Sequence, residues 1–151
     1  MSKSLVAIGY DHNGFDLKDD VIKFVELLGY KVIDVGGKIL DPNDDFPEFA
    51  ARAAAKVLQD DDTKAILICG GGQGMCMAAN RFKGIRASVL WDAFEAKMTR
   101  NDNDANICCL PGRLMINQPE TWQEIVETFL TTPFAGAVRF KRRNAQIDEL
   151  N

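Results

Sequence analysis

The chain has 151 residues and a formal net charge of -4 at pH 7, from 18 basic and 22 acidic side chains. This length suits one domain, spanning residues 1–151, and leaves too little chain for a second independent core. Hydrophobic residues make up 46% and charged residues 26%, which argues against a disordered chain. The acidic balance disfavours a nucleic-acid partner, and no apolar run approaches the roughly 20 residues that span a membrane.

The four cysteines, at positions 69, 76, 108 and 109, form no CxxC pair, and one histidine cannot complete a Cys/His zinc set. We therefore expect no metal. The N-terminus leads into only about five apolar residues, too few for a signal peptide, so a cytoplasmic protein without disulfides is expected. Cys76, Cys108 and Cys109 lie in apolar stretches and are interpreted as small buried hydrophobes.

Strand-like and helix-like stretches alternate along the whole chain. In chain order the sequence predicts a strand at 5–8, a helix at 16–28, a strand at 31–35, a loop at 36–46, a helix at 47–58, a strand at 65–69, a helix at 73–81, a strand at 85–90, a helix at 92–100, a strand at 105–110, a helix at 118–130 and a basic helix at about 135–149. Gly29 and Pro133 are expected to end helices, and Asp92 to cap one.

Five β/α units with short connections indicate a parallel sheet with helices on both faces. The predicted fold is an α/β three-layer sandwich, flavodoxin- or Rossmann-like, with a five-stranded parallel sheet. Ligands of such sheets bind outside the carboxyl ends of the strands. The candidate site residues are therefore those that directly follow strands, and the loop at 36–46 is a candidate binding loop.

The most informative of these positions is Cys69, which ends the third strand and precedes the run Gly70-Gly71-Gly72-Gln73-Gly74. The run fits neither a Walker loop nor GxGxxG. Its backbone N–H groups could hold an anion or a developing oxyanion, although a tight turn explains the glycines equally well. The same groups would favour the thiolate of Cys69, making it a nucleophile or a base; the alternative is a buried strand-end cysteine.

Two further groups of charged or titratable residues are candidates for the predicted site: the Asp11-His12 pair and the basic tail. His12 is the only histidine and follows Asp11, which could orient it; the alternative is a structural or exposed imidazole. The tail from Arg139 to Arg143 has four cations in five residues, with Arg139 and Arg143 on one helical face. It indicates a phosphate or another anion, or else a solvated basic helix. The acidic runs at 41–45 and 60–62 are interpreted as solvated loops.

Taken in order, these residues resemble the type B ribose-5-phosphate isomerases, grouped with the galactose-6-phosphate isomerase subunits. The resemblance runs from about residue 5 to about residue 145. The matching stretches are Gly9–Phe15, Asp45–Pro47, Ile68–Gly74, Ala78–Arg81, Gly84–Ala87, Asn103–Asn106, Gly112–Arg113 and Arg139–Arg143.

The resemblance implies aldose–ketose isomerisation of a small sugar phosphate through a cis-enediolate, without metal or cofactor. It implies a homodimer or homotetramer, with sites at the dimer interface and the basic helix packed on a partner subunit. It assigns the base to Cys69 and stabilisation of the enediolate oxygen to the loop containing Gly70, Gly71, Gly72 and Gly74. The residues that it assigns to substrate binding are Asp11, His12, Gly70, Gly72, Asn103, Arg113, Arg139 and Arg143.

Four positions depart from the family pattern. Gly71 replaces a threonine or serine, Phe46 a tyrosine and Phe140 a histidine. Asp102 replaces the histidine that is assigned to opening the furanose ring. Asp102 could itself be the catalytic acid or base, but a carboxylate is almost fully ionised at neutral pH and donates protons poorly.

These departures leave the substrate open. Ribose 5-phosphate is the family default, and the alternatives are a tetrose 4-phosphate, a hexose 6-phosphate, or a non-catalytic sugar-phosphate-binding subunit. A tetrose 4-phosphate needs no ring opening, because its esterified O4 cannot close a furanose. A flavin or nucleotide carrier is disfavoured because its fingerprints are absent.

Overall fold

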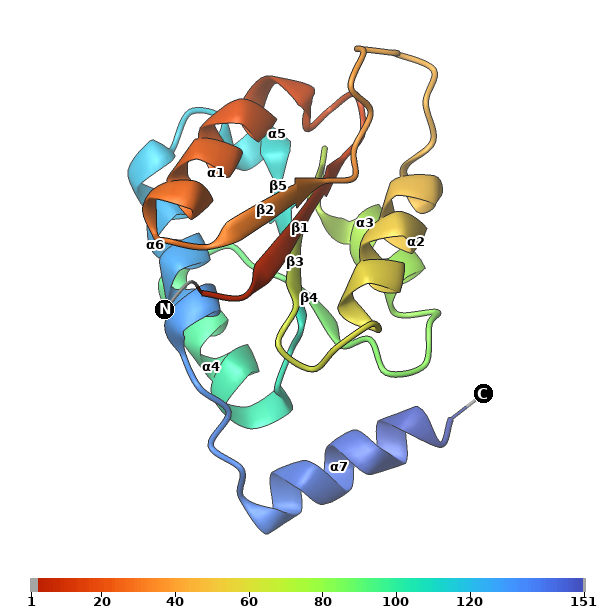
Figure 1. Ribbon diagram of the computed structural model, residues 1–151, viewed down its shortest axis with the longest axis vertical. Coiled ribbons are helices and arrows are strands. Elements are labelled where there is room, and N and C mark those ends of the chain that lie inside the picture. Colours follow the sequence, from red (N-terminus) through yellow and green to blue (C-terminus); the bar gives the residue numbers. More distant parts are fainter. Residues whose placement is uncertain (1–2, 151) are drawn as a thin grey trace.

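A parallel five-stranded sheet runs through the middle of the structure, a computed structural model that describes residues 3–150 (Figure 1). The strands are β1 Leu5–Tyr10, β2 Lys31–Asp34, β3 Lys64–Cys69, β4 Ala87–Val89 and β5 Ile107–Pro111. The helices are α1 Phe15–Leu27, α2 Phe46–Val57, α3 Gln73–Ala79, α4 Ala93–Asn103, α5 Gly112–Met115, α6 Pro119–Thr131 and α7 Val138–Asp148. The predicted α/β sandwich with five parallel strands is confirmed.

The strand order is β2-β1-β3-β5-β4, with β3 at the centre as its apolar sequence predicts. Flavodoxin-like sheets have the order 2-1-3-4-5, so the last two strands exchange places in this fold. The exchange sets β5 directly beside β3, and the register pairs Cys69 with Pro111. The two strand ends that carry Cys69 and the segment before Arg113 are therefore adjacent.

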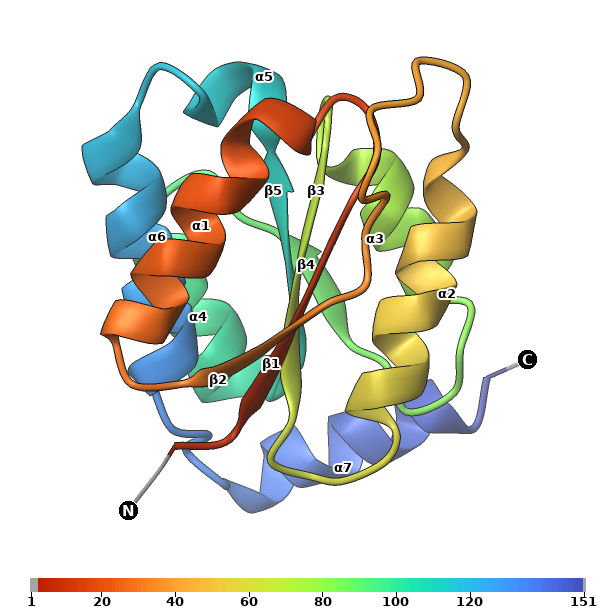
Figure 2. The same cartoon turned by 45° about the horizontal axis from the view of Figure 1, so that its top comes forward.

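Helices cover both faces of the sheet, and each face has its own core (Figure 2). Leu17, Val21 and Val25 recur every four residues on α1 and pack with α6 against one face. On the opposite face, α2 presents buried alanines to Ala7 and Ala65 of the sheet. Small residues on both sides allow the helix to lie close to the strands.

Helix boundaries differ from the predicted ones where local chemistry overrides the pattern. α4 continues to Asn103, beyond the predicted end at 100, and stops where Asp104 adopts a left-handed conformation with φ of +48°. Arg100 Nη1 bonds Asp104 Oδ1 at 2.8 Å, which supports that turn. The short helix α5 was not predicted, because one turn of four residues gives no periodicity.

The basic helix α7 begins at Val138, later than the predicted start near 135, and crosses the end of the sheet where the strands begin (Figure 1). Within the described residues it buries none of its side chains in its own chain. One tie to the domain is the Asp148 carboxylate, which accepts a hydrogen bond from the Gly84 N–H at 3.1 Å. No helix among residues 3–150 is long and apolar enough to cross a membrane.

Candidate active site

Four of the predicted site residues meet at the carboxyl edge of the sheet: Asp11, His12, Cys69 and Arg113. Cys69 ends β3 and is only 5% exposed. The Asp11 N–H donates to the carbonyl of Ile68 at 3.3 Å, which fixes the segment after β1 beside the end of β3. A thiol, a carboxylate, an imidazole and a guanidinium are thus held at one edge, as the strand order requires.

The glycine loop packs directly against Arg113. The Arg113 N–H donates to the Gly70 carbonyl at 3.1 Å. A Cβ placed on Gly70 would lie 3.0 Å from Arg113 Cζ, so the guanidinium rests on the bare backbone of the loop. Gly72 has φ of +73° and precedes α3, whose first N–H groups have no partner within the helix. The loop therefore combines unpaired backbone donors with an adjacent positive charge.

Phe46 closes the loop on its other side. A Cβ on Gly74 would meet Phe46 Cζ at 2.8 Å, so the aromatic ring lies on the first turn of α3. Pro47 follows at the start of α2 and favours helix initiation there. An apolar ring thus stands at this side of the loop.

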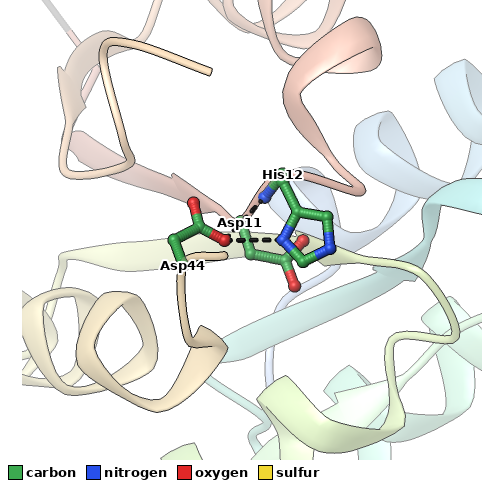
Figure 3. A group of neighbouring side chains, drawn as sticks. All are labelled: Asp11, His12 and Asp44. Carbon is green, nitrogen blue, oxygen red and sulfur yellow. Dashed lines mark hydrogen bonds and ion pairs between the residues drawn. The ribbon is translucent and has the colours of Figure 1, made fainter. Parts of the chain in front are cut away.

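The imidazole of His12 is held by Asp44, from the loop between β2 and α2 (Figure 3). His12 Nδ1 lies 2.7 Å from Asp44 Oδ1, and the His12 backbone N–H donates to the same oxygen at 3.1 Å. Asp11 instead accepts the Asn13 N–H at 2.9 Å. The prediction that Asp11 orients His12 is wrong, and so is the interpretation of Asp44 as part of a solvated loop.

Topology was the signal that could have found Asp44. Because α2 starts at the carboxyl edge, the last acidic residues before it must return to that edge. The composition of the acidic run at 41–45 does not indicate that Asp44 lies at the carboxyl edge.

The surroundings of His12 and Asp11 shift the pKa of both side chains. The pKa of His12 is raised from its ordinary value, mainly by the hydrogen bond with Asp44. The pKa of Asp11 is also raised, mainly because the group is buried, although the bond from Asn13 opposes the shift. His12 therefore keeps its proton to higher pH than a free imidazole does.

Asp11, His12 and Asp44 also offer ligand atoms that lie within 4.8 Å of one another. Such a set could approach a divalent ion, since one imidazole and two carboxylates suit several metals. Asp44 Oδ1 is already paired with His12, however, and Asp11 with a backbone N–H. These bonds give all three side chains partners without an ion.

The remaining predicted side chains lie at the opposite edge of the sheet. The Asn103 carbonyl accepts a bond from Arg86 Nε at 3.0 Å, which places the end of α4 beside the start of β4. Asp102 precedes it and accepts a bond from Asn101 Nδ2 at 2.8 Å. Arg139 and Arg143 are exposed on α7. One chain does not bring these four residues to Cys69.

Cys76 differs from the buried cysteine that was predicted. Its Sγ donates to the Ala87 carbonyl at 3.3 Å, and the side chain is partly exposed. A hydrogen bond with the Cys109 thiol lowers the pKa of Cys76 to about 7. Cys108 and Cys109 are fully buried, as predicted, and burial raises the pKa of both thiols.

Comparison with known proteins identifies the family. A profile described as Ribose/Galactose Isomerase matches residues 6–147. A probable ribose-5-phosphate isomerase B of Mycoplasma pneumoniae is 42% identical over 137 residues, covering 91% of this chain and 89% of that protein.

Solved structures agree with this result. A ribose 5-phosphate isomerase from Thermotoga maritima has a TM-score of 0.90 at 40% identity, covering 97% of this chain and 98% of that one. Ribose-5-phosphate isomerase B of Mycoplasma genitalium with bound ribulose-5-phosphate has a TM-score of 0.91 at 35% identity, covering 99% and 97%.

The chain is thus an isomerase, an enzyme of the aldose–ketose class. The chain belongs to the ribose/galactose isomerase family, which confirms the resemblance stated from the sequence.

Proposed function

We propose that this chain interconverts an aldose phosphate and a ketose phosphate through a cis-enediolate, with Cys69 as the base that moves the proton between C1 and C2. Ribose 5-phosphate and ribulose 5-phosphate are the proposed pair. The observation that carries the proposal is the position of Cys69, at the end of β3 beside the loop on which Arg113 rests. The Mycoplasma genitalium relative bound to ribulose-5-phosphate supports the choice of sugar.

The proposed chemistry needs three things, and the carboxyl edge offers candidates for each. A carbon acid beside a carbonyl needs a base, which is the Cys69 thiolate. The enediolate oxygen needs preorganised donors, which the N–H groups from Gly70 to Gly74 offer, with Gly71 and Gly74 nearest the reaction. The proton taken from C2 of the aldose is returned to C1, so no redox partner or cofactor is consumed.

Substrate binding is assigned to the polar side chains around that centre. Asp11 and His12 contact sugar hydroxyls, the ring oxygen or the phosphate. Arg113 adds positive charge beside the glycine loop. Neither cofactor nor metal has a step in this scheme.

The second half of the site is proposed to come from another copy of the chain. Asp102, Asn103, Arg139 and Arg143 lie at the amino edge, away from Cys69 of the same chain. Among the described residues α7 buries no side chain, as expected of a helix that packs on a partner subunit. We therefore propose a homodimer, or a tetramer of such dimers, with sites between subunits.

Subunit complementation tests this arrangement. Cys69→Ala in one chain and Arg139→Ala with Arg143→Ala in another each leave every site of their own dimer defective. Random mixing gives about one half mixed dimers, each with one intact site, so about a quarter of wild-type activity is expected at substrate concentrations well below the wild-type KM, where the arginine variant is defective. Recovery no greater than the sum of the two separate variants would contradict shared sites.

Solvent exchange tests the reaction itself. Purified protein in D2O is expected to wash deuterium into C1 of ribulose 5-phosphate and C2 of ribose 5-phosphate, with Cys69→Ala as the inactive control. Absence of exchange with pentose, tetrose and hexose phosphates alike would overturn the proposal and favour a non-catalytic binding subunit.

A second candidate substrate is favoured by the side chain at position 102. Asp102 stands where the resembling enzymes carry a ring-opening histidine, so this chain has no imidazole proton donor at that position. An acyclic tetrose 4-phosphate needs no such donor. Turnover of ribose 5-phosphate is compared with that of erythrose and erythrulose 4-phosphates, and a strong preference for the pentose rejects the tetrose. The expected cytoplasmic location stays a prediction.

A further inference from the structure

We propose that Asp44 is a positioning residue for His12: it fixes the imidazole by its ring nitrogen Nδ1 and keeps Nε2–H as a charged donor to an oxygen of the bound sugar phosphate. The inference rests on the proposed function, in which His12 binds substrate. Asp44 itself touches no substrate in this scheme. It acts only through the ring that it holds.

The geometry of the pair supports a fixed ring orientation. One oxygen of Asp44 receives both the Nδ1 contact at 2.7 Å and the His12 backbone N–H at 3.1 Å. Main chain and ring are therefore tied to the same atom, which leaves the imidazole little freedom to turn. Figure 3 shows Nε2 on the side of the ring remote from Asp44, where it has no partner among the side chains drawn.

Burial strengthens the contact. The Asp44 side chain is 10% exposed, whereas that of His12 is 30% exposed. A carboxylate that is mostly withdrawn from water interacts more strongly with a neighbouring cation than an exposed carboxylate does. The exposed part of the imidazole remains available to a ligand.

The charges around His12 all act in one direction. Among the described residues, the groups that influence its protonation are Asp44, Asp11 and Asp41, and each raises its pKa. Asp44 is the largest influence because it hydrogen-bonds the ring, and Asp41 acts only through its charge. A carboxylate at Nδ1–H stabilises the doubly protonated ring, whose Nε2–H is a donor, whereas in the neutral ring the same nitrogen is an acceptor.

The test variant removes charge while keeping shape. Asp44→Asn retains an oxygen that can accept both hydrogen bonds, so the loop should keep its conformation. Asp41→Asn is the matched control, because it removes the same charge from the same loop without a contact to the ring. The Asp41 side chain accepts the Asn43 N–H, and asparagine can preserve that bond as well.

The first readout is a proton NMR titration of the imidazole. His12 is the only histidine of the chain, so tag-free protein gives one assignable ring. Asp44→Asn is expected to move the titration midpoint to clearly lower pH, and Asp41→Asn to move it much less. Equal midpoints in wild type and Asp44→Asn, or equal shifts in the two variants, would overturn the inference. This readout needs no enzymatic activity, so it is independent of the proposed function.

The second readout is the pH dependence of isomerisation. We expect Asp44→Asn to raise the KM for ribose 5-phosphate more at about pH 7.5 than at about pH 6, with kcat retained, because the variant ring loses its positive charge at lower pH than the wild-type ring does. The increase is expected to be roughly tenfold at the higher pH and about twofold or less at the lower one. A loss that is the same at both pH values would mean that Asp44 only supports the loop. Wild-type protein that isomerises no sugar phosphate would instead refute the proposed function.

Discussion

The two ends of the sheet differ in how they hold their polar side chains. At the carboxyl edge Cys69 is 5% exposed, and Asp11 is 4% exposed, with bonds to the neighbouring backbone. At the amino edge Arg139 and Arg143 are exposed on α7, a helix that buries nothing in its own chain as far as the structure describes it. The carboxyl-edge groups are fixed within one chain, whereas the two arginines of α7 are exposed, although Arg100 at the same amino edge is 5% exposed and paired with Asp104.

This contrast follows from chain topology. The loops after β1, β3 and β5 meet at one edge and bond one another, so the fold orders their polar groups. α7 comes after another helix, α6, and not directly after a strand, and it lies at the end of the domain (Figure 2). Substitutions at the two edges should therefore have different consequences, which the following experiments measure.

Cys69→Ser should have the largest effect. We expect a fall of about 10³-fold in kcat with the fold retained, because a serine hydroxyl is a much weaker base than a thiolate. Cys76→Ser is the matched control, since a hydroxyl can keep the bond to the Ala87 carbonyl, and it should stay near wild type.

Alkylation gives a second measure of the same thiol. Substrate should protect Cys69 from iodoacetamide. Peptide mapping must separate it from Cys76, whose pKa is lowered to about 7 and whose thiolate also reacts near neutral pH. Turnover unchanged in Cys69→Ser would contradict the proposed base.

Substitution of two glycines of similar conformation, one at each edge, measures how much each edge contributes to the free energy of unfolding. Gly72 has φ of +73° and Gly136, ahead of α7, has φ of +71°. A Cβ on Gly72 would meet the Leu110 carbonyl carbon at 3.1 Å, but one on Gly136 would meet only Lys141 Cε at 3.7 Å. Urea unfolding should show a loss of about 2–3 kcal/mol for Gly72→Ala and about 1 kcal/mol for Gly136→Ala. Equal losses would show that the two edges are equally constrained.

Arg143→Ala should affect binding more than stability. A charge-assisted contact to phosphate predicts a rise of roughly tenfold in KM, with kcat within about twofold and little change in the free energy of unfolding. Arg142→Ala is the control: it removes the same charge from the preceding position of the helix and should change KM little. A large fall in kcat would mean that the Arg143 contact forms mainly in the transition state.

Asp102→Asn should have the smallest effect. The Asp102 side chain accepts a bond from Asn101, and asparagine keeps an oxygen for it, so we expect less than about a threefold change in kcat for ribose 5-phosphate. A fall of a hundredfold would instead make Asp102 the catalytic acid or base.

Much of the carboxyl edge could be predicted from the sequence. Alternating strand and helix patterns placed Cys69 after the central strand, and the ligand-binding rule for parallel sheets gathered Asp11, His12 and Arg113 beside it. These positions depend on the order of elements, which periodicity reveals. The exchange of β4 and β5 was not predicted, although the fully buried β5 suits the interior of the sheet and the half-buried β4 suits its edge.

The contact between Asp44 and His12 was missed because the acidic run was interpreted from its composition and not from its place just before α2. The two residues are separated by 32 positions, and the acidic loop carries no periodicity. Only the return of the chain to the start of α2 brings them together. The separation of Asp102 and Arg143 from Cys69 was equally hidden, since a motif shared with a family does not say which copy of the chain supplies it.

The exposed side chains of α7 affect how substitutions can change what this protein recognises. Apart from the partly buried Phe140, Asn144 and Asp148, the side chains of α7 are exposed in a single chain, so substitutions at those positions should cost its fold little. Changes at its exposed positions, from Arg139 onward, can alter what the molecule recognises while the domain beneath stays intact. The helix is therefore the segment of this chain most open to acquiring a new preference, by natural drift or in a randomised library.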